Sequence, residues 1–194
     1  MLRPTLILVW CFSGCATLAA DIVMKDLDGK ESRPLAASSE RKATALIFYL
    51  SDCPICNALA PEIERLRRDY VSKNAEILLV VVNPNSSADK VREHCRAFKL
   101  SSRALIDPDL KLAEAVSAKR TPEAVLLDAE GKVRYRGRIN DLYAALGRKR
   151  VEPTKHDLRE ALDAVLAGKT VAVPETEAIG CNLPEKSSSE KKKE

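Results

Sequence analysis

The 194-residue chain is long enough for one domain with a substantial core and short terminal segments. Apolar residues make up 45% and charged residues 31%, which is typical of a globular protein and argues against a disordered or membrane-embedded one. Basic and acidic residues (32 and 28) are interspersed, and there are only 3 Phe, 4 Tyr and 1 Trp. The sequence therefore excludes the basic, aromatic-lined surface that nucleic-acid binding requires.

Residues 1–20 have the pattern of a secretory signal peptide. Arg3 precedes a short apolar run at 6–12, whereas a membrane-spanning helix needs about 20 apolar residues. Two cleavage sites fit: the small residues at 17–20 suit ordinary signal peptidase, while Phe12-Ser13-Gly14-Cys15 resembles a lipoprotein box that would place a lipid anchor on Cys15. Either predicts export to a bacterial periplasm or cell envelope.

Four cysteines are expected in the exported chain. Cys11 lies in the leader, and Cys15 is either removed with it or acylated. The remaining four are Cys53, Cys56, Cys95 and Cys181. An oxidising compartment is where disulfides persist and where thiol enzymes make, break or correct them.

The predicted elements begin with a short strand and turn at 22–33, which we expect at an edge. The apolar run at 43–50 predicts a central strand covered on both faces. The cysteine pair then opens a helix, in which Pro61 is expected to bend the axis. Its apolar face consists of Ile55, Leu59, Ile63, Leu66 and Tyr70.

Strands and helices continue to alternate. The later elements are a strand at 77–82, a helix bearing Val91, Cys95 and Phe98, a strand at 104–106, a helix at 110–118, a hairpin at 124–137 and a helix at 158–166. Thr154 and Asp157 are spaced as a capping box for the last helix, and Gly168 can end it. This order predicts an α/β domain at 21–168 with a central sheet flanked by helices. The extension at 169–194 ends in a Ser/Lys/Glu tail that cannot build a core.

The motif that carries chemistry is Cys53-Pro54-Ile55-Cys56, placed where a strand passes into a helix. A cysteine at a helix N-terminus feels the positive end of the helix dipole, which favours the thiolate that attacks disulfides. Cys56, one turn into the helix, can close a disulfide with Cys53 locally. The alternatives are an inert disulfide and a metal-binding knuckle, but the strand-to-helix context favours redox chemistry.

These features resemble the thioredoxin superfamily, and most closely its redoxin branch of the alkyl hydroperoxide reductase/thiol-specific antioxidant type. Three features match: the C-x-x-C opening a helix, Pro61 eight residues after the first cysteine, and Thr121-Pro122 before the next strand. The similarity continues through 105–108 and 128–137. It implies a thioredoxin-like fold, a central mixed sheet flanked by helices, with an N-terminal strand extension and an inserted βα segment.

The resemblance also implies roles for individual residues. The cysteine pair would be catalytic, with Pro54 and Pro61 supporting it. Pro122 would be a cis-proline packed against the pair, and Thr121 would offer backbone groups to a bound thiol or peptide.

Two departures limit what the family implies. A peroxiredoxin places its peroxidatic cysteine in P-x-x-x-[TS]-x-x-C. Counted back from Cys53, Leu46 stands where that motif has Pro, and Leu50 stands where it has Thr or Ser. We therefore do not expect peroxide reduction by that mechanism. The Trp that precedes the pair in thioredoxins is replaced by Asp52, whose carboxylate would oppose thiolate formation if it came close.

The remaining thiols and histidine leave alternatives open. Cys95 is predicted to pack in the core as a small apolar residue. Cys181 lies in a segment without a clear helix or strand pattern, where it is an extra thiol, a disulfide partner, a ligand or a bystander. His94, with the cysteine pair, could supply soft ligands for copper.

The function expected from the sequence is that of an exported thiol-disulfide oxidoreductase. It would exchange disulfides with protein partners, draw electrons from an upstream thiol protein, and need no metal or organic cofactor. The alternatives are a copper metallochaperone using Cys53 and Cys56 with His94 or Cys181, and a redoxin domain whose pair is only structural.

Overall fold

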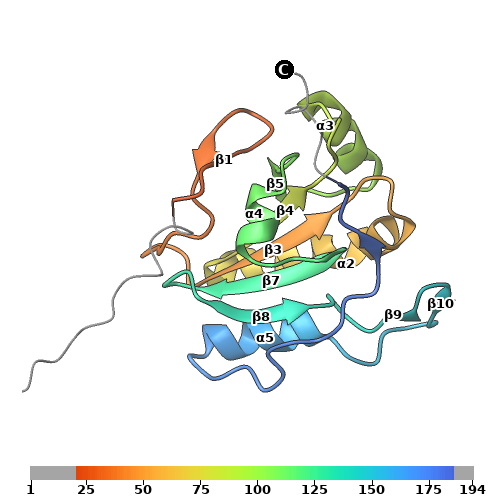
Figure 1. Cartoon of the computed structure of the whole chain (residues 1–194). Coiled ribbons are helices and arrows are strands. Elements are labelled where there is room, and N and C mark those ends of the chain that lie inside the picture. The colour runs from red at the N-terminus through yellow and green to blue at the C-terminus, as the bar shows by residue number, and fades with distance from the viewer. Residues whose placement is uncertain (1–20, 186–194) are drawn as a thin grey trace, which may run out of the picture.

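A five-stranded mixed sheet lies at the centre of the molecule (Figure 1). The computed structural model describes residues 21–185, so the predicted leader, the Cys15 anchor and the Ser/Lys/Glu tail at 186–194 lie outside the described residues. The strands are β3 (Ala43–Tyr49), β4 (Ala75–Val81), β5 (Arg103–Ile106), β7 (Glu123–Asp128) and β8 (Val133–Gly137). They lie in the order β5-β4-β3-β7-β8, with β3, β4 and β5 parallel and β7 and β8 antiparallel to their neighbours. The prediction of a central mixed sheet is confirmed.

Helices pack on both faces of this sheet. They are α2 (Pro54–Tyr70), followed by the 3-10 turn η1 (Val71–Lys73), α3 (Ala88–Ala97), α4 (Lys111–Ala115) and α5 (Asp157–Leu166). Alternate residues of a strand point to opposite faces. Accordingly Ala45, Ile47 and Tyr49 pack with α2 and α5, whereas Leu46 and Phe48 pack with α4. Every residue of β3 is buried, which explains its continuous apolar sequence.

Three pairs of short strands surround the central sheet. They are β1 (Met24–Lys25) with β2 (Glu31–Ser32), β9 (Tyr143–Ala145) with β10 (Arg148–Lys149), and β6 (Arg120–Thr121) with β11 (Cys181–Asn182). A bridge between Asp26 and Leu105 attaches the first pair to the free side of β5, so its predicted edge position is confirmed. The other two pairs were not predicted, because strands of two or three residues are too short to show a periodic pattern.

Helix α2 forms where the sequence predicts it and runs without interruption through Pro61, whose ring lies on the exposed side. Helix α3 begins at the predicted capping residues, since the Ser87 hydroxyl oxygen accepts a hydrogen bond from the Lys90 amide at 3.3 Å. Gly168 follows α5 with a positive φ of 67°, the conformation typical of a residue that ends a helix.

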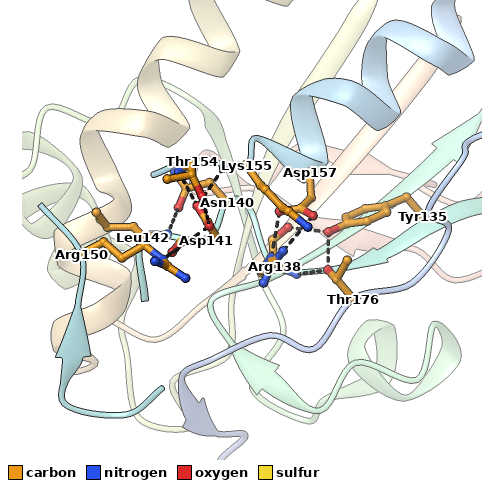
Figure 2. Close-up of polar contacts among 10 residues, drawn as sticks. All are labelled: Tyr135, Arg138, Asn140, Asp141, Leu142, Arg150, Thr154, Lys155, Asp157 and Thr176. Atoms are coloured by element: carbon orange, nitrogen blue, oxygen red, sulfur yellow. Dashed lines mark hydrogen bonds and ion pairs between the residues drawn. The ribbon is translucent and has the colours of Figure 1, made fainter. Parts of the chain in front are cut away.

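The predicted capping box of α5 is wrong. The Thr154 hydroxyl donates to Asp141 Oδ2 at 2.6 Å, and the amides of Thr154 and Lys155 donate to Asp141 Oδ1 at 2.7 and 2.9 Å (Figure 2). Asp157 instead forms an ion pair with Arg138 at 2.8 Å. Burial raises the pKa of the Asp141 carboxyl, but these hydrogen bonds outweigh it and hold that pKa well below its usual value. The buried loop carboxylate of Asp141 thus binds the Thr154 hydroxyl, which the sequence spacing had predicted would cap α5.

Within residues 21–185, no helix is both long enough and apolar enough to cross a membrane.

Candidate active site

The cysteine pair lies at the junction of β3 and α2. The chain leaves β3 at Tyr49 and turns through 50–52, where the Cys53 amide donates to the Leu50 carbonyl at 3.0 Å. Cys53 is the N-cap residue of α2 with extended backbone (φ −85°, ψ 116°), and Pro54 begins the helix, a position where its missing N–H costs nothing. The predicted placement of Cys53 at a helix N-terminus is therefore confirmed.

Both thiols are buried and close together. Cys53 and Cys56 have no accessible surface and are free thiols in this structure. The Cys53 thiol donates to the Thr121 carbonyl at 3.3 Å, while Cys56 Sγ accepts from the Leu50 amide at 3.5 Å. The site thus holds a reduced dithiol between the end of β3, the first turn of α2 and β6.

The two thiols differ in acidity. A hydrogen bond from the Cys56 thiol, together with the side chain and amide of Cys181 and the Cys56 amide, outweighs burial and lowers the pKa of Cys53 far below its usual value. Burial raises the pKa of Cys56 far above the usual value, and the neighbouring charge and hydrogen bond of Cys53 raise it further. Cys53 therefore ionises more readily than Cys56.

The peptide bond between Thr121 and Pro122 is cis, as the resemblance implies. Both residues are buried, and the Thr121 carbonyl faces the Cys53 thiol. Glu123, which the sequence analysis did not single out, accepts hydrogen bonds from the amides of Lys119 and Arg120 at 2.6 and 2.9 Å. This buried carboxylate holds the turn that leads into β6 and so positions the carbonyl beside the sulfur.

A polar group behind the cysteines was also missed by the sequence analysis. The Tyr49 hydroxyl donates to Asn57 Oδ1 at 2.7 Å and lies 3.1 Å from His94 Nε2. The Asn57 amide donates to the Ser51 carbonyl at 3.1 Å, and the Ser51 amide donates to Asn83 Oδ1 at 2.9 Å. These contacts fix the turn that presents Cys53. The only signal in the sequence is the presence of an amide residue directly after the cysteine motif.

His94 is part of this packing. Its ring lies edge-on to Tyr49 and stacks on Phe98 with centroids 4.5 Å apart, so Phe98 covers the histidine at the helix end and remains 36% exposed. Burial lowers the pKa of His94, which the Asp52 carboxylate partly offsets. Among the described residues, no group of three His, Cys, Asp or Glu side chains is arranged to hold a metal ion. His94 thus lies between Tyr49 and Phe98, with Nε2 3.1 Å from the Tyr49 hydroxyl.

The other two cysteines occupy different environments. Cys95 is buried on α3 beside Val91, and burial alone raises the pKa of its thiol, in agreement with a packing role. Cys181 lies in β11, where it pairs with Thr121, the residue whose carbonyl accepts a hydrogen bond from the Cys53 thiol. The structure therefore brings Cys181 to the predicted site, although no periodic pattern in its segment indicated this.

Comparison with known proteins supports the resemblance. The model of the Redoxin family matches residues 18–143. The chain is 29% identical over 117 residues to the thiol-disulfide oxidoreductase ResA of Halalkalibacterium halodurans, a match that covers 59% of this chain and 63% of that protein. It spans about three fifths of the length of the curated relatives it matches.

Solved structures show the same fold. A hypothetical protein from Sinorhizobium meliloti superposes with a TM-score of 0.72 at 27% identity, covering 85% of this chain and 91% of that one. A secreted disulfide oxidoreductase from Mycobacterium tuberculosis superposes with a TM-score of 0.54 at 16% identity, covering 77% and 97%, and shows the fold alone. The family match covers well over half of the chain and agrees with the mixed sheet and the dithiol at its helix junction. The chain therefore belongs to the Redoxin family and has a thioredoxin-like fold.

Proposed function

We propose that the protein is an exported thiol-disulfide oxidoreductase that exchanges disulfides with protein partners through Cys53 and Cys56. The observation that carries the proposal is the placement of two free thiols one turn apart at the N-terminus of α2, with Cys53 3.3 Å from the Thr121 carbonyl that precedes the cis-proline. The lowered pKa of Cys53 and the raised pKa of Cys56 agree with this arrangement. The similarity to ResA, a thiol-disulfide oxidoreductase, supports the same reaction class.

In the first step, the Cys53 thiolate attacks one sulfur of a substrate disulfide. An S–S bond forms between Cys53 and the substrate, and the other substrate sulfur leaves as a thiolate. The hydrogen bonds that stabilise the thiolate, including the amide of Cys56, are already present in the reduced protein. Because Cys53 has no accessible surface in this structure, the chain around it must open before a substrate sulfur can reach the thiolate.

In the second step, Cys56 attacks Cys53 Sγ, the mixed disulfide breaks, and the reduced substrate is released. Once Cys53 is bonded to the substrate, it no longer carries the charge that helps to raise the pKa of Cys56. Loss of that charge favours deprotonation of Cys56, and the Leu50 amide stabilises the resulting thiolate. The chemistry thus passes from one sulfur to the other in a fixed order. An upstream thiol protein would return two electrons to the Cys53–Cys56 disulfide.

The test is turnover of a model protein disulfide by single variants. Cys53→Ser is expected to abolish turnover, while Cys56→Ser is expected to accumulate mixed disulfides with the substrate. Cys95→Ser is the matched control, because Cys95 lies on α3 and not at the junction of β3 and α2, and its loss should leave turnover unchanged. Unchanged reductase activity in Cys53→Ser would overturn the assignment.

Export rests on the leader pattern at 1–20, and the mature N-terminus distinguishes its two forms. Mass spectrometry of the protein from its native host is expected to show either a chain that begins near Asp21 or an acylated Cys15. A cytoplasmic protein that keeps Met1 would contradict export.

A further inference from the structure

The segment after α5 returns to the dithiol. In Figure 1 it runs beside β8 and then rises toward the junction of β3 and α2. It ends in β11, where Cys181 lies opposite Thr121 and Asn182 lies opposite Arg120. Because the Thr121 carbonyl is the group that contacts the Cys53 thiol, any strand on this edge of β6 lies next to the reactive sulfur.

The approach of the two strands requires a glycine. A Cβ atom on Gly180 would lie 2.0 Å from the Thr121 carbonyl oxygen and 2.7 Å from its carbon, distances that real Cβ atoms do not show. The absence of a side chain at 180 therefore lets this backbone lie directly against β6.

Contacts further back along the segment hold it in place. The Arg136 amide donates to the Pro174 carbonyl and the Thr176 amide donates to the Arg136 carbonyl, each at 2.9 Å. Thr176 Oγ1 lies 2.6 Å from the Tyr135 hydroxyl and accepts from the Arg138 amide at 3.1 Å (Figure 2). The segment is thus fixed to β8 at 174–176, and β11 extends from that anchor.

Three thiols meet as a result. Cys181 lies opposite Thr121, whose carbonyl accepts a hydrogen bond from the Cys53 thiol, and Cys181 is partly exposed whereas Cys53 and Cys56 are fully buried. We propose that Cys181 is an internal redox partner of Cys53: a Cys53–Cys181 disulfide forms in exchange with Cys53–Cys56 and ties β11 over the edge of β6 that a substrate would use. This inference rests on the proposed function, because it requires a reactive Cys53.

The exchange is balanced without an external oxidant. In the oxidised protein the Cys181 thiolate attacks Cys53 Sγ, the Cys53–Cys56 bond breaks, and the Cys53–Cys181 bond forms. Cys56 leaves as a thiolate and takes up the proton that Cys181 released, so no electrons are gained or lost. Attack by Cys56 on Cys53 Sγ reverses the step and frees β11.

The test uses the full-length Cys56→Ser variant with glutathione disulfide. Cys53 first forms a mixed disulfide with glutathione, and Cys181 is expected to displace the glutathione and leave a Cys53–Cys181 disulfide. Peptide mapping without reduction, after acid quenching, identifies this bond. The variant that also carries Cys95→Ser should behave identically, whereas the one that also carries Cys181→Ser should retain the glutathione adduct.

Adding Gly180→Val to Cys56→Ser should slow formation of the internal disulfide by roughly tenfold or more, because the new side chain would push β11 from β6 and lower the local thiol concentration. A Cys53–glutathione adduct that persists while Cys181 is still alkylated would overturn the inference and leave the proposed function intact. Failure of Cys53 to react with glutathione disulfide at all would overturn both.

Discussion

The free energy of unfolding of the reduced protein, minus that of its Cys53–Cys56 disulfide form, should change with pH in a predictable direction. The folded reduced protein lowers the pKa of Cys53 below the ordinary thiol value of 9.0. Between the lowered pKa and 9.0, Cys53 is a thiolate in the folded chain and a thiol in the unfolded chain. The unfolded state then binds one more proton, so stability rises with pH.

The slope follows from that single proton. A difference of one bound proton changes the free energy of unfolding by about 1.4 kcal/mol per pH unit. The gain is lost as the pH falls through the lowered pKa of Cys53. Above pH 9.0 the trend reverses, because Cys56 has a raised pKa and stays a thiol in the folded chain while it ionises in the unfolded one. We therefore expect a rise, and then a decline in strongly alkaline solution.

Urea unfolding of both redox forms, measured from acidic to mildly alkaline pH, provides the assay. Subtracting the two free energies cancels groups that titrate alike in both forms. Reduced Cys53→Ser, in which the titrating thiol is gone, should lose the rise. A difference between the two redox forms of the wild type that stays constant with pH would refute the reasoning, since it would mean that Cys53 ionises as it does in the unfolded chain.

Two further substitutions test the support around the site and the start of α5. Tyr49→Phe removes the hydroxyl that donates to Asn57 Oδ1, so we expect a loss of about 1–3 kcal/mol in urea unfolding and slower reaction of Cys53 with a thiol reagent. Unchanged values for both would show that this contact does not hold the turn. Asp141→Ala leaves the amides of Thr154 and Lys155 without their acceptor, so the free energy of unfolding should fall by about 2–4 kcal/mol while the folded fraction keeps its turnover. One ordinary hydrogen bond contributes about 1 kcal/mol, so a decrease smaller than that would contradict the role of Asp141.

The parts of the fold that local pattern determines were predictable. The apolar run of β3, the periodic face of α2 and the glycine after α5 all reflect interactions within a few residues of one another. The cysteine motif between β3 and α2 likewise placed a thiol at the start of a helix. The cis-proline required the family resemblance, because the residues alone do not distinguish a cis from a trans bond.

The parts that depend on distant contacts were not predictable. Tyr49 meets His94 only because β3 and α3 pack together, and no local pattern encodes that meeting. Asp141 takes the hydrogen bonds of Thr154 through the fold of an intervening loop, which overrides a correctly spaced capping pair. The pairing of β6 with β11 joins two strands of two residues each, too short to leave a periodic signal.

The return of the chain to β6 has a consequence for how such proteins are delimited. The match to the Redoxin family ends at residue 143, and α5 ends at Leu166, yet the strand that pairs with Thr121 beside Cys53 carries a thiol at 181. A fragment trimmed to either boundary would keep Cys53 and Cys56 but expose the edge of β6 beside them. Its reactivity toward bulky disulfides would then describe the fragment and not the native protein.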